Sequence, residues 1–172
     1  MRKNSRLILA LFALAALFLM PLNPAFANAT ITIVNVDGPG EGFNDPGPAD
    51  PASTSGGNPG TSIGAQRLYA FQFAANIWGQ ILDSKVPIIV QASFDPLTCT
   101  PTSATLGAAG AIQIFATFPN APVANTWYHV ALANKLAGFD LAPASTDPAP
   151  DDIVAFFNSS LNGNPACLGG RG

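Results

Sequence analysis

Hydrophobic residues recur every three to four positions through the first half of residues 66–94, and this is the strongest pattern in the chain. That spacing returns the apolar side chains to one face of a helix. Thr61 and Ser62 are candidate N-caps, and Pro87 closes the pattern. The stretch therefore predicts an amphipathic helix that packs on other elements, with a stripe formed by Leu68, Phe71, Ala74, Ala75, Ile77, Trp78, Ile81 and Leu82.

Several short apolar runs predict strands. Residues 86–94 contain three β-branched residues in succession, which predicts a strand covered on both faces, with the preceding helix covering one of them. Residues 30–36 alternate between two sets of β-branched side chains and predict a second strand. Residues 153–157 form a last apolar strand, and residues 111–115 are a candidate for a short one.

A shorter helix is predicted at residues 127–136, where apolar residues again share one face. Asn125 or Thr126 can cap its first turn, and Gly138 is placed to end it. The segment 95–110 is rich in Pro and Gly and is predicted to be a connection between elements.

Residues 37–60 consist mainly of Gly, Pro, Asp, Asn and Ser, which predicts a long, partly mobile surface loop. Ca²⁺ prefers several oxygen ligands, so the acids of this loop are candidate ligands. Their spacing does not match an EF-hand, which favours a solvated loop over a calcium site. The acids are Asp37, Glu41, Asp45 and Asp50.

The predicted order is strand, loop, helix, strand, irregular segment, helix, strand. This order indicates an α+β or α/β fold in which two helices back a small mixed sheet. The length fits a single domain at residues 28–172, although the predicted elements leave its core incomplete.

The first 27 residues have the form of a signal peptide. A basic start is followed by an apolar run at residues 7–20 and by small residues around Ala25 and Ala27. Cleavage after Ala27 predicts a soluble, exported chain, either secreted or periplasmic. Nothing later approaches the ~18 consecutive apolar residues of a membrane span.

The charge of the mature chain excludes two kinds of partner. Removing the leader leaves four basic residues against ten acids, a net charge of −6. Nucleic acid and anionic membrane surfaces both require a basic footprint. We therefore expect neither as a partner.

Cys99 and Cys167 are the only cysteines. In an exported chain the simplest interpretation is one disulfide. The alternative is a Cys nucleophile, which requires a nearby base and a lowered pKa. A zinc site lacks the paired spacing that such sites show.

Recognisable catalytic motifs are missing from the sequence. His129 is the single histidine and lies beside Trp127 and Tyr128, where a packed or surface role is favoured over a catalytic one. Asp151 and Asp152 are adjacent at a strand start, so their side chains point to opposite faces and a solvated strand boundary is the favoured interpretation. There is no nucleophile elbow, phosphate loop or dinucleotide fingerprint.

Residues 70–90, with a helix of small residues, Trp78 and a Pro-Ile-x-Val strand, resemble the N-terminal part of zincin-type metallopeptidases. The segments VPIIVQASFDPLTC, FPNAPVANTWYHVALANKLAG and DIVAFFNSSLNGNPACLGG resemble the front portion of bacterial secreted peptidase-like proteins that also carry a protease-associated domain. The resemblance covers most of the mature chain.

The resemblance implies an incomplete, metzincin-like N-terminal subdomain. In zincins a helix with His-Glu-x-x-His follows this region; its imidazoles hold zinc and its Glu acts as general base. No residue here matches those groups, so zinc is expected only in a downstream segment, and no catalytic, cofactor-binding or metal residue is assigned. The last predicted strand is expected to form an edge for an extended peptide substrate: Ile153, Val154, Ala155, Phe156 and Phe157.

Two functional hypotheses follow. The first is the exported N-terminal portion of a zinc metallopeptidase-like domain, not catalytic as given, whose partner is a peptide or the missing C-terminal part of the domain. The alternative is a complete, small, disulfide-tied extracellular binding or surface module. A hydrolase based on His129 has no motif behind it.

Overall fold

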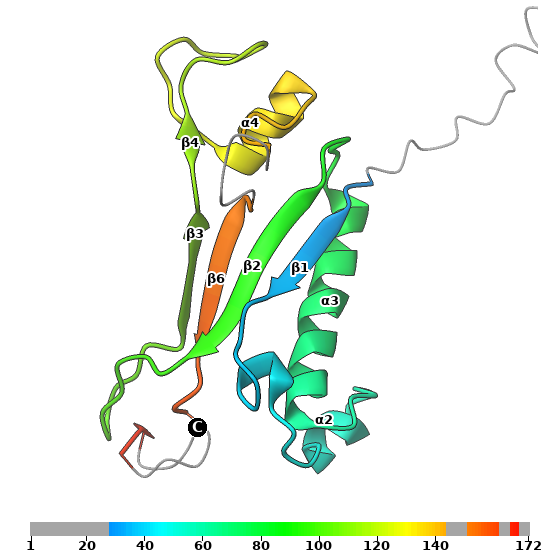
Figure 1. Cartoon of the computed structure of the whole chain (residues 1–172), viewed down its shortest axis with the longest axis vertical. Coiled ribbons are helices and arrows are strands. Elements are labelled where there is room, and N and C mark those ends of the chain that lie inside the picture. Colours follow the sequence, from blue (N-terminus) through cyan, green and yellow to red (C-terminus); the bar gives the residue numbers. More distant parts are fainter. Residues whose placement is uncertain (1–27, 144–150, 162–165, 169–172) are drawn as a thin grey trace, which may run out of the picture.

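The computed structural model describes residues 28–143, 151–161 and 166–168. The predicted leader, residues 1–27, lies outside this part of the chain. The described residues form an α+β structure in which one long helix lies along a small mixed sheet (Figure 1). This confirms the predicted fold class at that level.

Four strands form the main sheet: β1 (Ile31–Asn35), β2 (Ile88–Asp95), β6 (Ile153–Asn158) and β3 (Gly107–Ala111), in that spatial order. Strands β1, β2 and β6 are parallel, and β3 is antiparallel to β6. The predicted strands at 30–36, 86–94 and 153–157 are therefore confirmed within a residue or two. The edge strand β3 falls in the segment that was predicted to be a connection.

Helix α3 (Ile63–Ile81) confirms the strongest sequence pattern. The Ser62 side chain caps it by accepting a hydrogen bond of 3.1 Å from the Ala65 amide. Gly79 is buried where the helix meets the start of β1, and the Ala29 amide donates to its carbonyl at 2.8 Å. A side chain at Gly79 would clash with the Ala29 carbonyl, so glycine allows this close approach.

The segment 37–60 is more structured than its composition predicts. It contains a 3₁₀ turn, η1 (Gly42–Asn44), and a short helix, α2 (Pro51–Ser55), and it buries Phe43 to 5 % exposure. The Asp37 carboxylate accepts hydrogen bonds from the Phe43 amide at 2.7 Å and from the Phe94 amide at 2.8 Å. The description of this segment as a solvated loop is therefore wrong around Phe43, because that ring packs into the core.

Arg67 fastens the same segment to helix α3. Its guanidinium donates to the Gly42 carbonyl at 2.9 Å, lies 3.5 Å from the Asp45 carboxylate and stacks 4.5 Å from the centre of the Phe94 ring. The arrangement joins η1, α3 and β2 at one end of the sheet.

The second predicted helix begins later than its apolar pattern indicates. Strand β5 (Tyr128–His129) pairs with β4 (Ile114–Phe115), and α4 (Val130–Ala137) follows directly. Gly138 ends α4 with a φ of 83°, as predicted. Helix α4 contacts β4 and β5 and lies beyond the N-terminal end of β6, so the expectation that two helices back the sheet is wrong (Figure 1).

Candidate functional site

Strand β6 is not the edge of the sheet. It pairs with β2 on one side and β3 on the other, so Ile153, Val154, Ala155, Phe156 and Phe157 lie in an interior strand. The expectation that this strand offers an edge to a peptide is therefore wrong. Among the described strands, the outer edge on this side of the sheet belongs to β3.

The hydrogen bonds to β6 show which backbone groups of β3 have no strand partner within the described part of the chain. The Asn158 amide donates to the Leu106 carbonyl at 2.9 Å, and the Ile112 amide donates to the Asp152 carbonyl at 3.1 Å. Hydrogen-bonded pairs alternate with non-bonded pairs along an antiparallel ladder. The backbone N–H and C=O groups of Ala108 and Gly110 therefore face β6. The backbone groups of the remaining residues point away from the sheet: Gly107, Ala109 and Ala111.

An apolar groove of about 760 Å³ lies on the α3 face of the sheet. Its floor includes Ile33, Val90 and Ile153, which are aligned across β1, β2 and β6. Helix α3 forms one wall, and α4 closes one end through Leu132 and Lys135. Strand β2 is therefore not fully covered on the α3 face, contrary to the prediction that both of its faces are covered.

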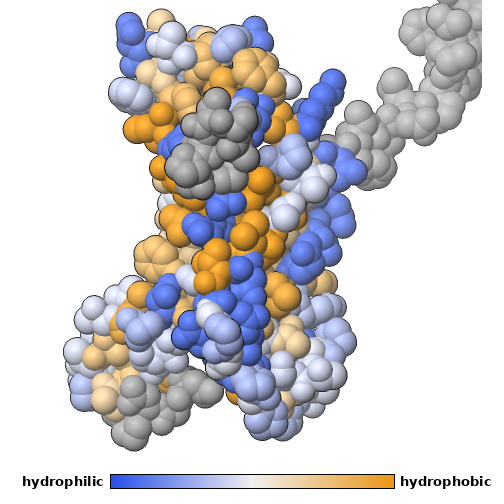
Figure 2. Space-filling model, viewed as in Figure 1, coloured by the Kyte–Doolittle hydropathy of each residue, from blue (hydrophilic) through white to orange (hydrophobic). Residues whose placement is uncertain are grey.

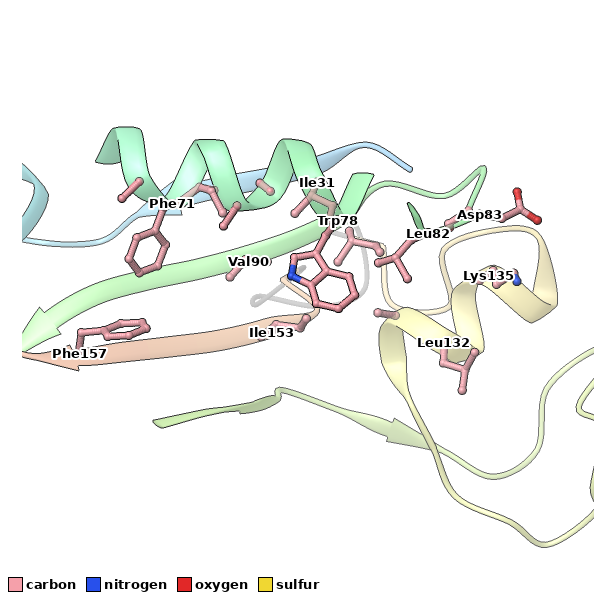
Figure 3. A pocket seen from close by; sticks show the side chains of 17 residues that line it. Ile31, Phe71, Trp78, Leu82, Asp83, Val90, Leu132, Lys135, Ile153 and Phe157 are labelled. Carbon is pink, nitrogen blue, oxygen red and sulfur yellow. The ribbon is translucent and has the colours of Figure 1, made fainter. Parts of the chain in front are cut away.

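Trp78 is the largest side chain in the groove. Figure 3 shows it projecting from α3 into the open space, with Val90 and Ile153 on the strands nearby. It is 54 % exposed. Hydrophobic residues also reach the surface over the middle of the molecule, where the strands lie (Figure 2).

The two ends of the groove differ in chemistry. Phe71 and Phe157 lie at one end with ring centres 5.1 Å apart. Asp83 and Lys135 lie at the other end (Figure 3). The groove is thus apolar along its length, with its charged lining residues at a single end.

Asp152 is a buried structural acid rather than a solvated strand boundary. It is 3 % exposed, and its carboxylate accepts from the Ile89 amide at 2.8 Å and from the Asn134 side-chain amide at 3.1 Å. Burial raises its pKa, with smaller raising effects from Asp140 and Asp151, while the two hydrogen bonds act in the opposite direction. The residue joins β6, β2 and α4.

The raised pKa of Asp152 predicts a pH effect on stability. The folded state holds the proton more tightly than the unfolded state, so this group favours folding at low pH and loses that contribution as the pH rises through its folded pKa. We expect the free energy of unfolding of wild type, relative to Asp152→Asn, to rise as the pH is lowered from neutral. Urea unfolding at several pH values measures the difference, and a fall over the same range would contradict the prediction.

His129 is exposed on β5, in agreement with a surface histidine. It lines a second cavity of about 260 Å³ together with Asp152 and residues of β3. Both carboxylate oxygens of Asp152 already accept hydrogen bonds, and the lining contains no Ser or Cys. This cavity does not assemble a nucleophile, base and acid.

Cys99 and Cys167 form a disulfide, as predicted, with a Cα–Cα distance of 5.0 Å. The alternative of a Cys nucleophile is therefore wrong. The bridge holds residues 166–168 near the exit of β2, and the Leu168 amide donates to the Thr100 carbonyl at 2.8 Å.

Within the described residues, no group of three or more His, Cys, Asp or Glu side chains is placed to hold a metal ion. The loop acids bind other groups of the protein: the Asp50 carboxylate, for example, caps α2 by accepting from the Ala52 and Ser53 amides, and these bonds lower its pKa. In the same part of the chain, no helix is long and apolar enough to cross a membrane.

Comparison of the chain with protein-family models, with curated proteins and with solved structures found no match. The site is therefore defined by its geometry alone. It consists of a free strand edge on β3 and an open apolar groove between α3, α4 and the sheet.

Proposed function

We propose that this chain is the exported N-terminal portion of a zinc metallopeptidase-like domain, secreted or periplasmic, that binds an extended peptide but does not cleave it as given. The observation that carries the proposal is a mixed sheet that, within the described residues, has both an unpaired antiparallel edge strand and a partly covered apolar face. A sheet with one face half covered is an incomplete layer, and a further element would complete it.

The peptide-binding part of the proposal now rests on β3. The outward-facing backbone donors and acceptors of this strand have the spacing that an added strand requires; they belong to Gly107, Ala109 and Ala111. Their side chains are at most a methyl group, so a peptide backbone can approach closely. A negative net charge on the mature chain favours peptides without excess acid.

The zinc part of the proposal rests on the resemblance to zincins and on a downstream segment. The described residues do not fit a zinc site, because no set of three ligands comes together in them. A His-Glu-x-x-His helix would supply two imidazoles and a general base. The residues described here would position a peptide and support that helix.

The first test is the reading frame beyond codon 172. We expect it to continue and to encode His-Glu-x-x-His, and we expect the longer purified protein to hold about one zinc per chain. Elemental analysis measures the metal, and cleavage of a casein substrate measures activity. A stop codon at that point, or a continuation without the motif, overturns the metallopeptidase proposal.

Two proline variants test the edge strand. Ala109→Pro removes an amide that points away from the sheet, so we expect lost peptide binding with little change in stability. Ala108→Pro removes an amide that faces β6, so we expect the free energy of unfolding to fall by about 1 kcal/mol or more. Thermal unfolding and titration with a labelled extended peptide measure the two effects.

Equal destabilisation by the two prolines would contradict the register that we assign to the free edge. Unchanged peptide binding by Ala109→Pro, at full stability, would show that the peptide lies elsewhere.

The alternative proposal is a complete disulfide-tied binding module. One observation favours it: the Cys99–Cys167 bridge closes 68 residues of the chain and ties its last described segment to the sheet. Cooperative urea unfolding of residues 28–172, together with a reading frame that stops after Gly172, would support this module over the metallopeptidase portion.

A further inference from the structure

We infer that the cavity of about 260 Å³ beside β3 is a specificity pocket, which accepts one aliphatic side chain of a peptide bound antiparallel to this strand. The inference rests on the proposed function, since it needs a peptide paired with β3. It adds the class of peptide: an extended segment that carries an uncharged aliphatic residue opposite Ala111.

The cavity is walled on its outer side by the edge strand itself. Strand β3 forms the edge of the described sheet farthest from β1 (Figure 1). It contributes Ala109, Gly110 and Ala111 to the lining, while Ala131 of α4 and Ile153 of β6 lie on the inner side. The outer wall thus carries methyl groups at most, so a side chain from an added strand can pass over it into the cavity.

The register of the sheet places the cavity on the same face as α3. Ala111 pairs with Ile153, and Ile153 lines both this cavity and the apolar groove along α3. Residues directly opposite each other on neighbouring strands share a face, so the Ala111 methyl group points to that face as well. A peptide residue opposite Ala111 therefore directs its side chain toward the cavity.

The outward-facing backbone groups of β3 are in phase with the cavity. They belong to Gly107, Ala109 and Ala111, so an antiparallel peptide forms a hydrogen-bonded pair at Ala111. The peptide residue that exchanges two backbone hydrogen bonds there is also the one whose side chain faces the cavity. One residue is thus held by its backbone and selected by its side chain.

The chemistry of the lining selects an aliphatic side chain. The polar lining residues are His129, which is exposed on β5, and Asp152, which is 3 % exposed. Both carboxylate oxygens of Asp152 already accept hydrogen bonds, at 2.8 and 3.1 Å. An acidic side chain would lie beside this buried carboxylate, and a basic one would give up its hydration inside a cavity walled mainly by apolar groups.

The cavity also provides the means of fixing the register of the peptide. The sequence of β3, Gly-Ala-Ala-Gly-Ala, presents no side chain larger than a methyl group. Register is weakly specified along Gly-rich strands, so the edge alone would let a peptide slip by two residues. A single aliphatic residue that fits the cavity determines where along β3 the peptide binds.

Titration of the purified chain with guest peptides tests the inference. The probe is a short, fluorescently labelled peptide of Thr and Ala with one central guest residue, and its anisotropy measures binding. We expect the Leu guest to bind at least about tenfold more tightly than the Ala guest, since each buried methylene raises affinity about fourfold. Lys and Asp guests should bind no more tightly than the Ala guest.

Two leucine substitutions on the same strand separate the cavity from the edge. Ala111→Leu fills the cavity, so the preference for the Leu guest should fall to about twofold or less. Ala108→Leu adds the same atoms to the opposite face of β3, outside the cavity lining, and should keep the preference. Ala131→Leu fills the cavity from α4 without changing β3 and should act like Ala111→Leu. Thermal unfolding shows that each variant is folded.

The outcomes separate the pocket from the proposed edge. Equal affinity for Leu and Ala guests, with both lost in Ala109→Pro, would overturn the pocket and leave peptide binding at β3 standing. A Lys guest that binds as tightly as Leu, or an equal loss of preference in Ala108→Leu and Ala111→Leu, would also overturn the pocket. Binding that Ala109→Pro leaves unchanged would contradict the proposed edge, and the pocket would fall with it.

Discussion

Replacing Phe43 with alanine is expected to lower the free energy of unfolding by about 3–5 kcal/mol, the usual cost of removing a buried aromatic ring. Phe43 is 5 % exposed. Its ring meets those of Phe71 and Phe94 edge to face, with centres 4.9 and 5.3 Å away. No other side chain of residues 37–60 occupies this position, so the truncation leaves a cavity between α3 and β2.

Urea unfolding followed by circular dichroism measures the effect. Tryptophan fluorescence is a weaker probe, because Trp78 and Trp127 are both more than half exposed in the folded chain. Phe73→Ala is the matched control: Phe73 is 55 % exposed and stacks on Tyr69, so we expect the free energy of unfolding to fall by less than about 1 kcal/mol. A similar loss for the two variants would show that residues 37–60 do not contribute to the core.

Residues 37–60 also show where sequence reasoning ends. Their composition predicts a loop, and most of their backbone is one. The apolar content that anchors them is a single phenylalanine, and its burial depends on the rings of Phe71 and Phe94, which contact it from α3 and β2. One aromatic residue in a polar segment has no periodicity, so no local pattern indicates that it is buried.

The elements with periodic patterns were predictable. Helix α3 and strands β1, β2 and β6 each carry a repeat of apolar positions that depends only on local geometry. Strand β3 carries no such repeat, because Gly and Ala have low strand propensity and contribute little side-chain contact. Its pairing with β6 is a tertiary effect, and the free edge was therefore assigned to the wrong strand.

The groove was visible in the sequence only indirectly. The apolar stripe of α3 was predicted, and so was an incomplete core. What the sequence could not show is that α4 lies beyond the sheet rather than on it, because β5 takes Tyr128 and His129 out of the predicted helix. The uncovered face follows from that displacement.

Removing the disulfide is the second change with a large expected effect. The bridge closes 68 residues, and a loop of that size is worth about 4 kcal/mol in the chain-entropy description. Cys167 is fully buried, and the Cys99→Ala, Cys167→Ala double variant removes only the two sulfur atoms from the side chains. We expect its unfolding midpoint in urea to fall to that of the reduced wild type.

The control is the double variant with and without reductant, which should give the same midpoint. A wild-type midpoint that is unchanged on reduction would mean that the native contacts around residues 166–168 already hold this segment in place.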